Sequence, residues 1–164
     1  MKRVVIIGVG NLLMGDEGVG VYIANRLRNL QMPEGVEVHE CGTGGLRILE
    51  ALEGAERAII IDAVRVGGEP GTIYRFPLSE VMDEERGFRM VSSHDLDLIT
   101  SIRIGELVGI YKLPRDILVI GVEPEVLEVS AKLSPKVERA VEKVIELILK
   151  EIEDTEREVQ KCKR

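Results

Sequence analysis

The chain has 164 residues, of which 45% are hydrophobic, 31% charged and only 3% aromatic. This composition excludes a disordered chain and predicts one domain whose core is built from valine, isoleucine and leucine. The net charge of −7 argues against nucleic acid or an anionic membrane as the partner, because both would repel the protein.

The sequence carries no pattern of export or membrane insertion. Asn11, Asp16 and Glu17 interrupt the start before a signal-like apolar stretch can form, and no apolar run reaches about 18 residues. Cys41 and Cys162 lack CxxC spacing and suit a reducing compartment. We therefore expect a cytoplasmic protein.

The first predicted element is a strand over residues 4–7, which leads into a glycine-rich loop. Four consecutive β-branched residues are typical of a strand covered on both faces, so we expect this strand at the centre of a parallel sheet. Ligands bind at the carboxyl ends of the strands in such sheets. Asp16 and Glu17 lie in this loop and are therefore the first candidates for chemistry.

Two more strands are predicted to reach the same edge of the sheet. A helix over about 18–30 precedes a strand over 36–41, which ends in a flexible loop containing Gly42, Thr43 and Gly44. A short helix from residue 46 then leads to a strand over 58–61, with Asp62 at its carboxyl end.

The second half of the chain predicts an antiparallel strand and two long helices. No helix intervenes before residues 72–77, which predicts an antiparallel strand, and its terminal proline suits a sheet edge. Residues 78–90 read as a connector with one short helical turn. Ser92 or Ser93 begins the next helix. The last strand covers 116–122.

The final helix begins at Ser134-Pro135, a capping residue followed by proline at the first helical position. From residue 152 the pattern is purely charged, so we expect residues 151–164 to form a charged, frayed tail. The fold class is α/β, a three-layer α/β/α sandwich. Its sheet is mostly parallel and twisted, with about five strands and one antiparallel edge strand, within a single domain over residues 1–150.

Nucleotide binding is the first functional alternative. Gly8-Val9-Gly10 after a strand is similar to a dinucleotide fingerprint, and Glu40 at the end of the second strand is placed to hold a ribose. However, Leu13 stands where the third glycine belongs, and carboxylates at a helix N-terminus compete with a pyrophosphate. The chain also lacks a GxxxxGK[ST] loop, a GxSxG elbow and an HExxH helix. We therefore expect no nucleotide cofactor.

Three scattered side chains form a better candidate. Glu17, Asp62 and His94 are each predicted near the carboxyl edge of the sheet. Two carboxylates and an imidazole make an incomplete shell for a divalent transition metal, which leaves positions for water or substrate. The ordinary alternative is that His94 is hydrogen-bonded locally and that Asp62 caps the end of its strand.

These residues occur in motifs that resemble the nickel-iron hydrogenase maturation endopeptidases over residues 3–148. The motifs are Gly8-x-Gly10-Asn11-x-Leu13-x-x-Asp16-Glu17-Gly18-x-Gly20, Asp62-Ala63 before Pro70-Gly71-Thr72, and Ser92-Ser93-His94-Asp95. The resemblance implies a twisted sheet between helices and a single cut that removes a C-terminal extension from the hydrogenase large subunit after nickel insertion. Where the family commonly has Asp-Gly-Gly-Thr, this chain has Glu40-Cys41-Gly42-Thr43.

The resemblance assigns roles to residues. It implies that Glu17, Asp62 and His94 bind nickel supplied with the precursor of the hydrogenase large subunit, which is the expected partner. The catalytic candidates are Glu17, Asp62 and Glu40, and the substrate-binding candidates are Gly42, Thr43 and Gly44. Either the metal or a carboxylate activates the water that cleaves the peptide.

Asp16 is expected outside the metal shell, where it braces its loop by accepting hydrogen bonds from glycine-rich neighbours. Two rival functions remain open at this point: a non-catalytic nickel chaperone and a nucleotide-binding module.

Overall fold

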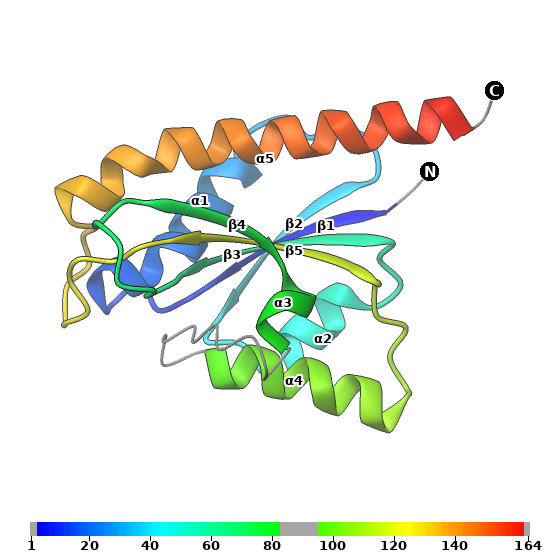
Figure 1. The fold of residues 1–164 in the computed structure, drawn as a ribbon, viewed down its shortest axis with the longest axis horizontal. Coiled ribbons are helices and arrows are strands. Elements are labelled where there is room, and N and C mark those ends of the chain that lie inside the picture. Colours follow the sequence, from blue (N-terminus) through cyan, green and yellow to red (C-terminus); the bar gives the residue numbers. More distant parts are fainter. Residues whose placement is uncertain (1–2, 83–94, 163–164) are drawn as a thin grey trace.

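The computed structural model describes residues 3–82 and 95–162, and their core is a five-stranded sheet (Figure 1). The strands are β1 Val4–Val9, β2 Val36–Gly42, β3 Arg57–Ala63, β4 Ile73–Pro77 and β5 Asp116–Val122. Their spatial order is β2-β1-β3-β5-β4, in which β4 alone runs antiparallel to its neighbour. The predicted fold class and the antiparallel edge strand are confirmed.

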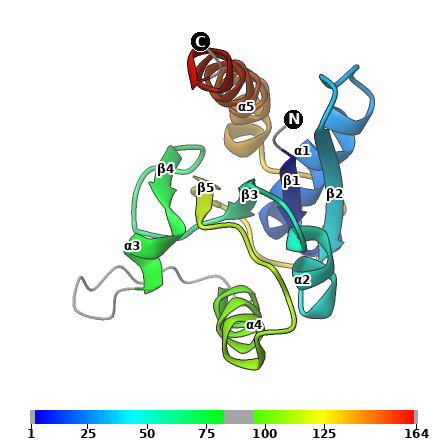
Figure 2. The ribbon, with the colours of Figure 1, turned by 90° about the vertical axis from the view of Figure 1, so that its right-hand side faces the viewer.

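Helices cover both faces of the sheet (Figure 2). They are the 3-10 turn η1 Gly15–Gly18, α1 Val19–Arg28, α2 Leu46–Leu52, α3 Leu78–Met82, α4 Asp95–Val108 and α5 Pro135–Cys162. Val5 and Ile7 of β1 pack in the core beneath α2 and α4, whereas Ile6 faces the core of α1 and α5. Side chains alternate between the faces of a strand, so an uninterrupted apolar run supplies both cores.

The position of β1 differs from the prediction. This strand is interior, but the middle of the sheet is β3, which pairs with β1 on one side and β5 on the other. Both strands are buried along almost their whole length, so burial alone does not distinguish the middle strand from its neighbour.

The frayed tail expected from residue 152 is also wrong, since α5 continues to Cys162. Glu151, Ile152 and Thr155 are buried. Arg57 and Arg75 donate hydrogen bonds to the Glu151 carboxylate at 2.9 and 2.6 Å. This charged turn of α5 therefore packs on the sheet, because Glu151 is paired with Arg57 on β3 and Arg75 on β4.

Replacing Glu151 by Gln should lower the free energy of unfolding at pH 7 by about 2 kcal/mol, between the usual values for exposed and buried ion pairs. The hydrogen bond from Arg75, with that from Arg57, lowers the pKa of Glu151 against the opposing effect of burial. A lowered folded-state pKa stabilises the fold above the unfolded pKa and loses that effect as the pH falls through the folded value.

Urea unfolding of both proteins at several pH values measures this contribution. The difference between wild type and Glu151→Gln should narrow below pH of about 4.3, the unfolded value for glutamate. The exposed Glu146 on the same helix supplies the control Glu146→Gln. If the difference in the free energy of unfolding between wild type and Glu151→Gln did not change with pH, the ionised Glu151 carboxylate would not be the source of the stabilisation.

Four carboxyl ends meet at one edge of the sheet, because β1, β2, β3 and β5 are parallel. The loops that follow these strands lie on the left in Figure 1, and the start of α5 lies there too. This edge carries the described part of the predicted site. Within residues 3–82 and 95–162, no helix combines the length and the apolar character needed to cross a bilayer.

Candidate functional site

Glu17 lies in η1, directly after the loop that leaves β1, and is buried. Its backbone is held close to the end of that strand. A Cβ on Gly10 would stand 1.8 Å from the Glu17 carbonyl oxygen, and Gly10 has φ of 136°. Only glycine accommodates both this approach and this backbone conformation.

Asp62 is fully buried near the carboxyl end of β3. Its Oδ1 accepts a hydrogen bond from the Ala63 N–H at 2.8 Å. Asp62 follows the buried aliphatic run Ile59–Ile61 of this strand, and a carboxylate in such surroundings costs free energy to bury, so its presence there requires a chemical or structural reason.

Glu17 and Asp62 lie on elements that touch each other, since η1 contacts β3. The start of α1 also rests on the same strand. A Cβ on Gly20 would lie 2.1 Å from the Ile61 carbonyl oxygen and 2.4 Å from that of Val9. The glycine therefore brings the helix against the residue that precedes Asp62.

His94 lies outside the described residues, and α4 is described from Asp95. Within the described ranges, no group of three or more histidine, cysteine and acidic side chains is placed to hold a metal ion. The Glu17–Asp62–His94 triangle therefore stays a prediction. The donor set itself, two carboxylates and an imidazole, suits nickel.

The Glu40 candidate lies in a different environment from Glu17 and Asp62, because its side chain is exposed on β2. It lines a hollow of about 290 Å³ together with His39, Arg47 and Glu50. Neighbouring Cys41 is buried, and this burial raises the pKa of its thiol to about 11. Glu40 thus borders the carboxyl edge as a solvated carboxylate.

The loop of substrate-binding candidates is joined to the loop that carries Glu17. The register between β1 and β2 shifts at their ends, and the Gly10 N–H donates to the Gly42 carbonyl at 2.7 Å. Gly42 has φ of 55° and Gly44 has φ of 98°. Thr43 is exposed between these two glycines.

Asp16 braces its loop as predicted, but its partners differ from those expected. Its Oδ2 accepts hydrogen bonds from the N–H groups of Glu125 and Val126 and from the Ser134 hydroxyl, each at 2.8 Å. Its Oδ1 accepts from the Ser134 N–H at 2.7 Å. These donors belong to the segment between β5 and α5, so Asp16 joins two loops of the edge.

Glu123 was missed by the sequence analysis. This buried residue follows β5 and accepts hydrogen bonds from the N–H groups of Val66 and Gly67 and from the Tyr74 hydroxyl. Burial, with the hydrogen bond to Glu123, raises the pKa of Tyr74. Glu123 thus fixes the segment that follows Asp62. A carboxylate directly after an apolar strand is the signal that could have identified it.

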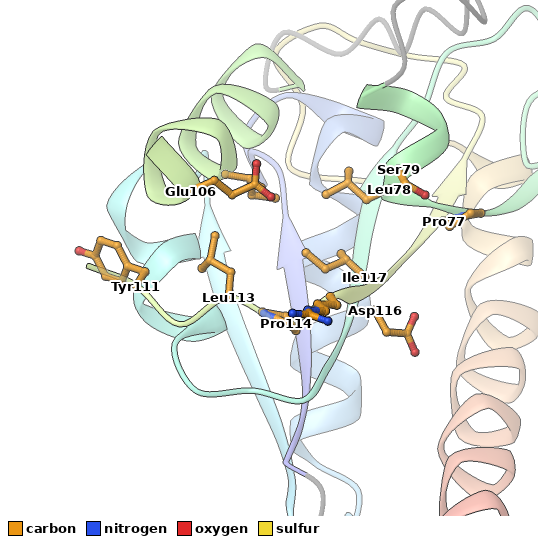
Figure 3. Close-up of a pocket in the computed structure, with 11 residues that line it drawn as sticks. Pro77, Leu78, Ser79, Glu106, Tyr111, Leu113, Pro114, Asp116 and Ile117 are labelled. Carbon is orange, nitrogen blue, oxygen red and sulfur yellow. The ribbon is translucent and has the colours of Figure 1, made fainter. Parts of the chain in front are cut away.

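A separate cavity of about 490 Å³ lies at the opposite edge of the sheet (Figure 3). Leu78, Leu113 and Ile117 line it together with Glu106 and Asp116. Asp116 begins β5, so the cavity lies at the amino end of this strand. It contains none of the predicted site residues and is not at the edge where open α/β sheets bind ligands.

Comparisons with known proteins point to one family. The family model described as "Hydrogenase maturation protease" matches residues 21–151. Hydrogenase 2 maturation protease from Escherichia coli (strain K12) is 32% identical over 90% of this chain and 88% of the relative. The solved hydrogenase maturating endopeptidase HybD from E. coli has a TM-score of 0.81 and 30% identity, over 93% of both chains. The HybD protease from Thermococcus kodakarensis has a TM-score of 0.75 and 29% identity, over 90% of this chain and 97% of that one.

Proposed function

Since the chain belongs to the hydrogenase maturation protease family, we propose that it is an endopeptidase for the precursor of a nickel-iron hydrogenase large subunit. It removes the C-terminal extension of this precursor after nickel has been inserted. The nickel arrives with the substrate and is the feature that the enzyme recognises.

One observation carries the proposal: two buried carboxylates, Glu17 and Asp62, lie on touching elements at the carboxyl edge of the sheet. A divalent cation in the substrate offsets the cost of burying such charges, since oppositely charged groups attract strongly away from water. His94 is proposed as the third ligand. The three side chains then orient the bound substrate, which converts weak contacts into a geometry close to that of reaction.

Cleavage requires a water molecule and a base. The oxygen of the water forms a bond to the carbonyl carbon of the scissile peptide, and the C–N bond breaks. Glu17 or Asp62 takes the proton from the water, and the departing amine receives a proton. Nickel in the substrate supplies Lewis acidity at the same place. Glu40 remains a third catalytic candidate, at the rim of the site.

The extended C-terminal segment of the precursor needs a backbone to lie against. We assign this role to the main-chain groups of Gly42, Thr43 and Gly44, which are the last residue of the edge strand β2 and the two residues after it. Main-chain hydrogen bonds of this kind hold a peptide with little dependence on its sequence. Recognition of the nickel then restricts cleavage to loaded precursors.

The proposal is tested by incubating the enzyme with nickel-loaded and with nickel-free precursor and measuring intact masses. We expect a loss of mass at the precursor C-terminus for the loaded form alone. Equal cutting of both forms would show that the enzyme does not recognise its substrate through nickel. Tight binding of nickel by the enzyme alone without any cutting would indicate a chaperone, and thermal protection by NAD or ATP would indicate a nucleotide-binding module.

A further inference from the structure

Exposed aliphatic residues occur in the segments that follow the parallel strands, at the edge that carries Glu17 and Asp62. They follow the carboxyl ends of all four parallel strands, with two after β1 and one each after β2, β3 and β5. These residues are between 38% and 85% exposed. We name this set the aliphatic rim: Leu12, Leu13, Leu46, Val66 and Val129.

The rim makes up half of the large hydrophobic side chains that are exposed among the described residues. The other half lies elsewhere, at the end of α1 and around the end of α4. Single exposed aliphatic residues are ordinary on protein surfaces. An exposed aliphatic residue after each of four strands at one edge is a pattern that those single cases do not explain.

Hydrogen bonds between the loops hold the rim in place. The Ser130 N–H donates to the Leu13 carbonyl at 3.0 Å, and the Gly15 N–H donates to the Ser130 carbonyl at 2.8 Å. In Figure 1 the blue loop after β1 and the yellow loop after β5 lie side by side at the left end of the sheet. The loops after β3 and β5 are also joined, because the Val66 N–H donates to Glu123 Oε2 at 3.0 Å.

Leu13 shows how this framework directs a side chain outward. Its N–H donates to Asn11 Oδ1 at 2.9 Å, and its carbonyl accepts from Ser130. Both backbone groups are therefore fixed by partners inside the loops, although the residue as a whole is 66% exposed. The exposure of Leu13 is part of a defined loop structure, and burying it against a partner would remove apolar surface from water without reordering the backbone.

We propose that the aliphatic rim is the docking surface for an apolar, extended segment of the hydrogenase precursor beside the bond that is cut. This inference rests on the proposed function. A peptide bond that reaches Glu17 and Asp62 lies at the edge where the loops after β1, β2, β3 and β5 begin, so the chain on either side of that bond lies near these loops. Aliphatic contacts suit this role in a protein with a net charge of −7, because they do not depend on a basic partner.

The test compares a rim variant with a matched variant at the other edge. Leu13→Ser combined with Val129→Ser removes two aliphatic side chains from joined loops, and Leu46→Ser removes one from a separate loop. Leu107→Ser is the control, since Leu107 is 86% exposed near the end of α4. Thermal unfolding first establishes that each variant is folded.

Two quantities are measured with nickel-loaded precursor: KM and kcat for the mass loss, and Kd for the precursor in the Glu17→Gln background. We expect KM and Kd to rise about tenfold for each side chain removed from the rim, with kcat changed less than twofold. The rise should persist at high salt, because the lost contact is apolar. Leu107→Ser should leave both constants unchanged.

An unchanged Kd in the rim variants, or an equal loss in Leu107→Ser, would overturn the inference. Failure of the proposed function has a different result, since wild type would then not cut the precursor. If that protein still binds the precursor and the rim variants do not, the docking surface stands without the protease activity. If wild type does not bind the precursor either, both proposals fall.

Discussion

Glu17→Gln is expected to abolish removal of the precursor extension, with a fall in rate of at least about 10³-fold, while the protein folds normally. Glutamine keeps the size of the side chain but removes the negative charge, so it neither attracts the substrate nickel nor accepts a proton. The residue is buried, and replacing a charge there with a neutral amide adds no volume. A time course of intact precursor mass measures the rate, and thermal unfolding by circular dichroism measures the fold.

The exposed Glu128, on the segment that joins β5 to α5, provides a control at the same edge. Glu128→Gln should process the precursor at the wild-type rate. Asp62→Asn and His94→Ala should behave like Glu17→Gln if the three residues act on one ion. Full activity in Glu17→Gln would reassign this buried carboxylate to the fold and remove the central residue of the proposal.

Unlike Glu17→Gln, Asp16→Asn is expected to destabilise the fold, lowering the free energy of unfolding by about 3 kcal/mol or more. The Asp16 carboxylate accepts hydrogen bonds from three backbone N–H groups and one hydroxyl. An asparagine has one acceptor oxygen, and its NH₂ group would face donors. For a domain of this size the melting temperature should fall by roughly 6–12 °C.

Processing should also slow in Asp16→Asn, because the loop that carries Glu17 loses the side-chain hydrogen bonds that join it to the segment before α5. Guanidinium unfolding at pH 7 measures the stability, and the mass assay measures processing. Ser134→Ala removes the hydroxyl but keeps the N–H donor, so its loss should be smaller, about 1 kcal/mol. A wild-type melting temperature for Asp16→Asn would show that the hydrogen bonds to Asp16 contribute little.

The two neighbouring acidic residues are therefore separated by experiment. Glu17→Gln should lose activity and keep stability, whereas Asp16→Asn should lose both. Nothing in the sequence Asp16-Glu17 distinguishes the two roles, since both are acidic and both follow the same strand. The distinction lies in the partners of the Asp16 carboxylate, which belong to the segment between β5 and α5.

Local sequence determined the elements of this protein. The apolar run of β1 predicted a strand covered on both faces, and β5 covers Asp116–Val122, the range predicted from its apolar residues. The absence of a helix before β4 predicted an antiparallel strand at an edge, which is confirmed. Side-chain periodicity and connection length are set by neighbouring residues, so they can be read without the fold. The motifs around Glu17 and Asp62 likewise indicated the family.

Tertiary structure alone decided how these elements meet. It placed β3 rather than β1 in the middle of the sheet, and it brought Arg57 and Arg75 to Glu151 so that α5 continues to Cys162. It also paired Asp16 with Ser134, 118 positions away. Such pairings depend on which loops become neighbours when the sheet forms. Residues so far apart in the chain produce no periodic sequence pattern from which their contact could be predicted. The sequence alone therefore predicted which edge of the sheet carries the candidate residues. The hydrogen-bond partners of the carboxylates at this edge, such as Asp16, were determined by the tertiary fold.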